Sequence, residues 1–122
     1  MSEVISESDF LYRRFFRNQY VQGIDGMRVS SQAYFQRKAD IGLSVNLARM
    51  STPEDTLKGG TPEMGVGELS ASVPLNNEIT LEHAPETLNQ AHVLMFGDFS
   101  SKSRRKLLAA ATKVVLPPSN KS

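Results

Sequence analysis

Residues 91–97, AHVLMFG, form the most hydrophobic run of the chain, and residues 100–115, SSKSRRKLLAAATKVV, follow it almost directly. A short apolar run that ends at a glycine is typical of a strand inside a sheet. The second stretch begins with serines, which are good N-caps, and its apolar residues share one helical face. These residues are Leu107, Leu108, Ala111, Val114 and Val115. The pattern predicts a central strand at 91–96 and a C-terminal helix after the serines.

Upstream, two segments carry local signals for a strand and for a helix start. Leu43, Val45 and Leu47 alternate with Ser, Asn and Ala, which puts three aliphatic side chains on one face of a strand. Thr52 and Pro53 precede two acidic residues, which is the pattern of a capped helix start. This helix is expected to end at Gly59-Gly60 after one or two turns.

Residues 64–81 have the pattern of a β-hairpin. Residues 64–73 hold apolar residues interrupted by two glycines, as in a strand that bends or bulges near its start. Asn76-Asn77 suits a turn, because asparagine tolerates a positive φ. Residues 78–81 are then predicted to return as the second strand of the hairpin.

The chain of 122 residues has room for one hydrophobic core. At its start, Ser8 and Asp9 precede the aromatic and arginine-rich residues 10–17, a pattern that predicts a short helix. We therefore predict a single α+β domain over residues 1–118, in which this short N-terminal helix and the C-terminal helix pack on a mostly antiparallel sheet. Residues 119–122 are expected to be a frayed tail.

Composition excludes several kinds of chemistry. There is no cysteine, so a disulfide framework, a thiolate nucleophile and a cysteine-ligated metal are all excluded. Two histidines and dispersed acids show no metal-binding spacing, so no metal and no cofactor is predicted. No run of residues is apolar and long enough for a membrane span, and the start lacks the pattern of a secretory signal. A cytoplasmic protein without a membrane partner is expected.

Charge is distributed unevenly along the chain. Residues 1–49 carry a net +2, residues 50–98 carry −7, and residues 99–122 carry +6, which together give the formal net charge of +1. Such asymmetry indicates either an anionic partner for the C-terminal part or internal pairing between the acidic middle and the basic end.

The strongest local signal is a group of serines and bases at the predicted start of the C-terminal helix. Cations oppose the helix dipole there, whereas a bound anion reverses that penalty. The predicted anion-binding residues are Ser101, Lys102, Ser103, Arg104, Arg105 and Lys106. The alternative is that these bases form a solvated face or pair with residues 50–98.

A second group of bases lies among aromatic residues near the N-terminus. Guanidinium groups beside rings can bind phosphates and stack on bases. Arg13, Arg14 and Arg17 are therefore possible second anion contacts, although their spacing does not allow all three to be buried together on one helix. The alternative is a core of aromatics with the arginines outside.

Three functions follow from these patterns. The first is a small cytosolic binding or accessory protein that engages nucleic acid or a phosphate-bearing ligand through its basic C-terminal helix. The second is enzymatic: His92 would act as general acid or base in a metal-independent phosphodiesterase of ribonuclease type, or in a transferase. The third is an interaction subunit that docks on a protein partner through its acidic residues 50–98.

The layout of the chain carries one resemblance, from which no function is transferred. The arginine-rich aromatic start, Ser30-Ser31, the Asn89-x-x-His92 spacing and the closing basic helix resemble small bacterial toxin-type domains. The resemblance covers scattered positions only. Whether the protein is an enzyme, and its oligomeric state, are left open by the sequence.

Overall fold

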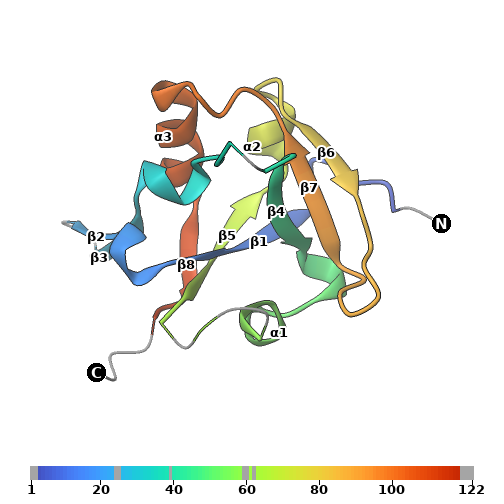
Figure 1. The fold of residues 1–122 in the computed structure, drawn as a ribbon, viewed down its shortest axis with the longest axis horizontal. Coiled ribbons are helices and arrows are strands. Elements are labelled where there is room, and N and C mark those ends of the chain that lie inside the picture. The colour runs from blue at the N-terminus through green and yellow to red at the C-terminus, as the bar shows by residue number, and fades with distance from the viewer. Residues whose placement is uncertain (1–2, 24–25, 39, 59–60, 62, 119–122) are drawn as a thin grey trace.

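The computed structural model describes residues 3–23, 26–38, 40–58, 61 and 63–118. Among these residues, six strands form one antiparallel sheet in the order β6-β7-β4-β1-β5-β8, and two more form a small antiparallel ribbon (Figure 1). Helices pack against the large sheet, so the small α+β architecture with a mostly antiparallel sheet is confirmed.

The strands and helices have the following bounds. The large sheet contains β1 (Phe10–Phe15), β4 (Leu43–Leu47), β5 (Gly65–Ser70), β6 (Thr80–His83), β7 (His92–Phe96) and β8 (Lys113–Leu116), and the ribbon contains β2 (Tyr20–Gly23) and β3 (Gly26–Val29). The α-helices are α1 (Pro53–Leu57), α2 (Ser72–Leu75) and α3 (Lys102–Ala111). Three short 3-10 helices are η1 (Arg17–Gln19), η2 (Ser31–Tyr34) and η3 (Ala48–Met50).

The two faces of the large sheet differ in chemistry. Alternate residues of a strand point to opposite faces, and one set forms the hydrophobic core with α3 and η2. This set includes Leu11, Phe15, Val45, Leu47, Val93 and Met95, all at most 3% exposed. The other set contains Tyr12 and Arg14 in β1, Ser44 and Asn46 in β4, and His92 beside the apolar Leu94 and Phe96 in β7. Helix α1 lies on this second side, across the sheet from α2 and α3 (Figure 1).

The expected strands at 43–47 and 91–96 are present as β4 and β7, and β7 lies inside the sheet between β6 and β4. Thr52 caps α1 as expected, because its hydroxyl accepts the amide of Asp55 at 3.0 Å. The expected helix end at Gly59-Gly60 and the expected frayed tail at 119–122 lie outside the described residues.

The prediction of a short N-terminal helix is wrong, because residues 10–15 form the strand β1 between β4 and β5. The buried residues Leu11 and Phe15 are four apart, and this spacing places two side chains on one face in a strand as well as in a helix. Pairing of residues 10–15 with β4 on one edge and with β5 on the other favours the strand over the helix. The carboxylate of Asp9, expected in a first helical turn, instead accepts the amide of Ser6 at 2.9 Å.

The predicted hairpin around Asn76-Asn77 is also wrong. Residues 72–75 form α2, and β6 pairs with β7 rather than with β5. The two asparagines close the helical turn instead, because their side-chain amides donate to the carbonyls of Ser72 and Val73 at 2.7 and 2.6 Å. The positive φ, 62°, falls on Glu78.

Helix α3 begins after Ser101 as expected but ends at Ala111, before Val114 and Val115. The Thr112 hydroxyl donates to the carbonyl of Leu108 at 2.7 Å, and the backbone is extended from Thr112 onward. The two valines, which are β-branched, lie in β8 and pair with β5. The predicted helical face therefore extended one turn too far.

The raised pKa values of the three tyrosines indicate how the stability of the fold changes at alkaline pH. Burial is the main cause that raises the pKa of Tyr12, Tyr20 and Tyr34 above the ordinary value of about 10. Since the folded state favours the neutral phenols, their contribution to stability is complete below about pH 10 and falls as pH rises above it. We expect phenolate absorbance to appear together with loss of the circular dichroism signal of the fold. Titration of the three phenols near pH 10 in a folded protein would contradict this.

Candidate functional site

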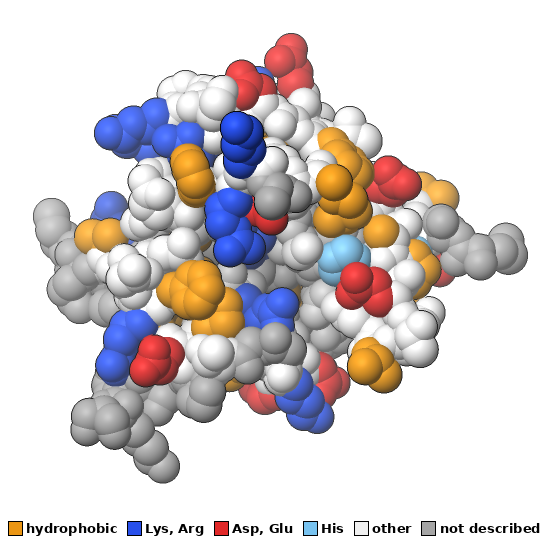
Figure 2. Space-filling model, in the orientation of Figure 1, with side chains coloured by type: hydrophobic (Ala, Val, Ile, Leu, Met, Phe, Trp, Pro, Cys, Tyr) orange, Lys and Arg blue, Asp and Glu red, His pale blue; other side chains and the backbone are white. Residues whose placement is uncertain are grey.

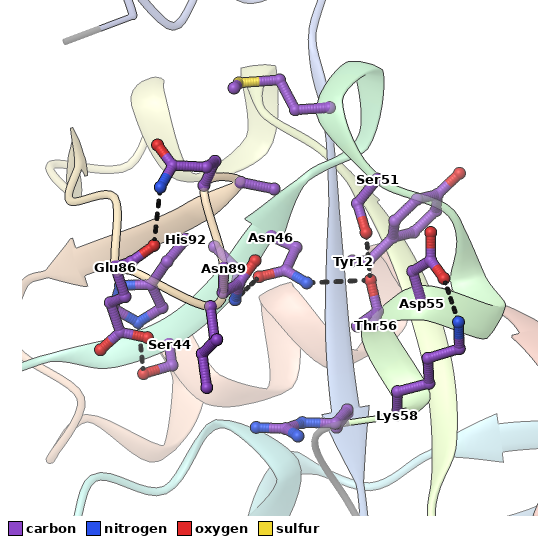
Figure 3. Close-up of a pocket in the computed structure, with 16 residues that line it drawn as sticks. Tyr12, Ser44, Asn46, Ser51, Asp55, Thr56, Lys58, Glu86, Asn89 and His92 are labelled. Carbon is purple, nitrogen blue, oxygen red and sulfur yellow. Dashed lines mark hydrogen bonds and ion pairs between the residues drawn. The ribbon is translucent and has the colours of Figure 1, made fainter. Parts of the chain in front are cut away.

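A pocket of about 720 Å³ lies on the polar face of the large sheet, and we call it the sheet-face pocket (Figure 3). Its floor comes from β1, β4 and β7. One wall is the segment from η3 through α1, and the other is the loop between β6 and β7. The floor and walls carry the side chains that matter below: Tyr12, Arg14, Ser44, Asn46, Thr56 and His92.

A chain of hydrogen bonds joins the two walls across the floor. The amide of Asn89 in the β6–β7 loop donates to the Asn46 side-chain oxygen at 2.8 Å, and the Asn46 amide donates to the Thr56 hydroxyl of α1 at 3.0 Å. Ser51 contacts the same hydroxyl at 3.1 Å. Asn46 and Thr56 are 8% and 5% exposed, so their polar groups are satisfied within the protein. The pocket is therefore held open by fixed side chains.

His92 makes two hydrogen bonds that define the tautomer of its neutral ring. Its Nδ1 lies 2.9 Å from the carbonyl oxygen of Ala84, and its Nε2 lies 3.1 Å from the Ser44 hydroxyl oxygen. A carbonyl can only accept, so Nδ1 carries the proton. In the neutral ring Nε2 is then an acceptor, and the Ser44 hydroxyl donates to it. Figure 3 shows Ser44 directed at the imidazole.

Arg14 brings a positive charge to the sheet-face pocket. It is partly buried and makes no hydrogen bond or ion pair with any other residue that the structure describes. The other cation of the lining, Lys58, forms an ion pair with Asp55 at 3.0 Å. The remaining acid, Glu86, is exposed on the β6–β7 loop. Among the described lining residues, Arg14 is thus the cation whose charge is left for a ligand.

The other two arginines of the predicted second group lie elsewhere. Arg13 is next to Arg14 in β1 and points away from the sheet-face pocket. It donates to the carbonyl oxygens of Ala33 and Ser44 at 2.6 and 2.7 Å, and its guanidinium lies 5.4 Å from the ring centre of Tyr34. Arg17 is exposed in η1 and does not line the sheet-face pocket. The structure therefore separates three residues that the sequence grouped.

Tyr12 adds a hydroxyl group to the lining. Burial and, to a smaller extent, the nearby carboxylates of Glu68 and Glu54 raise its pKa. The phenol is consequently protonated at neutral pH and is able to donate a hydrogen bond to a ligand.

The basic residues predicted to bind an anion at the start of α3 are partly engaged within the protein. Arg104 pairs with Glu78 at 3.3 Å, which is one contact between the acidic middle and the basic end. Arg105 is 9% exposed and donates to the carbonyl of Phe99 at 2.6 Å. Ser101 accepts the amide of Arg104 and contacts Ser103 at 3.0 Å.

Two bases of this group remain exposed on α3, namely Lys102 and Lys106. Figure 2 shows basic side chains over this helix. These lysines are the charged part of the predicted anion site that is exposed to solvent.

Ser44 and Asn46 were not singled out by the sequence beyond being polar positions of an alternating strand. Their signal appears only when β4 is placed between β1 and β7, because the same face then carries Tyr12, Arg14 and His92 as well. The order of the strands brings these side chains together on one face, and no local sequence pattern indicates that order.

Comparison with protein-family models, with curated proteins and with solved structures finds no match for the chain. In the described part of the chain, no group of three or more His, Asp or Glu side chains is arranged to hold a metal ion. None of the helices that the structure describes combines the length and the apolar character needed to cross a bilayer.

Proposed function

We propose that the protein binds a phosphate-bearing ligand in the sheet-face pocket, with Arg14 as the residue that binds the phosphate. The observation that carries this proposal is the partly buried residue Arg14, whose guanidinium has no described hydrogen-bond or ion-pair partner. A planar guanidinium offers paired donors to phosphate oxygens. The volume of about 720 Å³ lies within the range of small-molecule sites.

The neighbouring polar groups suit the rest of such a ligand. Tyr12 has a protonated hydroxyl, and Asn89 and Lys58 retain donor hydrogens beyond those used within the protein. These groups can contact the hydroxyls of a sugar or the edge of a base. A cytoplasmic location agrees with this role and stays a prediction.

The basic start of α3 is the second candidate for the same partner. Lys102 and Lys106 are exposed there and favour it. The engagement of Arg104 by Glu78 and of Arg105 by Phe99 weakens it, because each guanidinium already donates to a protein acceptor, although Nε of Arg105 is buried without a partner among the described residues. We therefore place the sheet-face pocket first.

Replacing Arg14 with glutamine is expected to weaken binding of inorganic phosphate, of adenosine monophosphate and of a short fluorescent single-stranded RNA by tenfold or more. Charge-assisted hydrogen bonds contribute about 1.5–3 kcal/mol each, and the amide retains shape without charge. Calorimetry and fluorescence anisotropy at low and moderate salt measure the change. The double variant Lys102→Ala/Lys106→Ala is the matched control and should bind as the unchanged protein does.

The opposite pattern, loss of binding in the lysine variant and none in Arg14→Gln, would place the ligand on α3. If the unchanged protein binds none of the three probes, the proposal is overturned. Docking through the acidic residues 50–98 would then be the hypothesis to pursue, by charge reversal of that segment.

A further inference from the structure

We infer that Ser44 and His92 form a nucleophile and its base, and that the sheet-face pocket hydrolyses a phosphodiester through a covalent phosphoserine. The inference rests on the proposed function, since Arg14 must hold the phosphate of the substrate. It differs from a ribonuclease-type reaction in that the attacking oxygen belongs to the protein and not to the substrate.

The first support is the three-membered arrangement around the imidazole. An activated serine needs a base within hydrogen-bond reach and a third group that orients the base. The Ser44 hydroxyl lies 3.1 Å from Nε2, and the Ala84 carbonyl accepts from Nδ1–H at 2.9 Å. The carbonyl thus fixes the tautomer in which Nε2 is free to take the serine proton.

The second support is that each member is placed by regular structure. Ser44 and His92 belong to the paired strands β4 and β7. The Ala84 amide donates to the carbonyl of His92 at 2.9 Å, which fixes the orienting residue beside the strand. On the other side Arg13 donates to the carbonyl of Ser44 at 2.7 Å and holds the backbone of the nucleophile. Sites built on strands in this way keep the geometry that a transfer reaction needs.

The third support is charge. A phosphodiester carries a single negative charge, and Arg14 supplies a single unpaired positive charge in the same pocket. Its guanidinium donates to the non-bridging oxygens and stabilises the charge that they hold as the new bond forms. The diester class therefore fits the lining better than a dianionic monoester.

The reaction has two steps that balance. In the first, Ser44 Oγ bonds to phosphorus, its proton passes to His92 Nε2, the ester bond to the leaving oxygen breaks, and Nε2 returns the proton to that oxygen. In the second, water attacks the phosphoserine, gives a proton to Nε2, and the P–Oγ bond breaks as Oγ regains a proton. The products are one alcohol and one phosphomonoester.

A fluorophosphonate probe tests the nucleophile directly, because Ser44 Oγ displaces fluoride and stays labelled. Mass spectrometry should find one label per chain on the peptide that contains Ser44, and Ser44→Ala should remove it. His92→Ala should slow labelling by about 100-fold or more, the scale of general-base catalysis, and added imidazole should restore part of the rate. Ser8→Ala, which changes an exposed serine that precedes β1, is the control and should label normally. Labelling away from Ser44, or no rescue by imidazole, contradicts the inference.

Turnover of bis(p-nitrophenyl) phosphate, measured beside calorimetric binding of inorganic phosphate, separates this inference from the proposed function. Ser44→Ala should lose turnover and keep phosphate binding, because Arg14 is unchanged. Phosphate binding without turnover or labelling in the unchanged protein overturns the serine mechanism and leaves the proposed function standing. Turnover that persists in Ser44→Ala also overturns it. If the unchanged protein binds neither inorganic phosphate nor the other two probes, the proposed function itself is overturned.

Discussion

Replacing Phe15 with alanine is expected to lower the free energy of unfolding by about 3–5 kcal/mol, the usual cost of truncating a buried aromatic side chain. Phe15 is 1% exposed at the end of β1 and meets the ring of Tyr20 edge-on, with ring centres 4.3 Å apart. Its ring also lies against Gly67, where a β-carbon would come within 3.3 Å of it. Urea denaturation followed by circular dichroism measures the change.

The neighbouring residue provides a matched control. Phe16 follows β1 and is 52% exposed, so Phe16→Ala should change the free energy of unfolding by about 0.5 kcal/mol or less. The contrast between the two adjacent phenylalanines arises because Phe15 is the last residue of β1 and is buried in the core, whereas Phe16 lies beyond the strand and is exposed. Similar losses from both variants would contradict the placement of β1 in the core.

Replacing Arg13 with methionine is expected to cost about 2–4 kcal/mol of stability, because it removes two hydrogen bonds of a charged donor and leaves the two carbonyl oxygens without that donor. In the pairing between β1 and β4, Leu11 lies opposite Leu47 and Tyr12 lies opposite Asn46. Beyond these two pairs, the Arg13 guanidinium donates to the carbonyl oxygen of Ser44.

Arg13 keeps its positive charge in the folded protein although its side chain is partly buried. Burial lowers the pKa of Arg13, but an arginine stays protonated because its ordinary pKa lies far above neutrality. The Tyr34 ring beneath the guanidinium compensates part of the lost hydration.

Arg14 is the control for Arg13, and the two variants should separate stability from binding. Arg14→Met should unfold at nearly the same urea concentration as the unchanged protein, since it breaks no hydrogen bond or ion pair to a described residue, while it loses phosphate binding. Arg13→Met should unfold at a lower concentration. Equal stability of the two variants would show that the carbonyl contacts of Arg13 contribute little.

Prediction from the sequence succeeded where a local signal is unambiguous. The alternation of residues 43–47, the apolar run of 91–96 and the cap Thr52 each specify one structure, and each is present. A serine cap was also expected before the C-terminal helix, and the structure assigns it to Ser101. Prediction failed at residues 10–15, where a four-residue spacing fits both a helix and a strand, and at 76–77, where asparagines close a helical turn and not a hairpin. Pairing with distant strands decided both cases.

The same division applies to the site. The sequence by itself determined the small α+β fold and the absence of cysteine, and it named His92 as a candidate proton carrier and Arg14 as one of three possible anion contacts. Only the tertiary structure placed Ser44 against the imidazole and turned Arg13 and Arg14 to opposite faces. The physical reason is that a sheet gathers side chains by strand order and register, which depend on pairing between segments far apart in the chain.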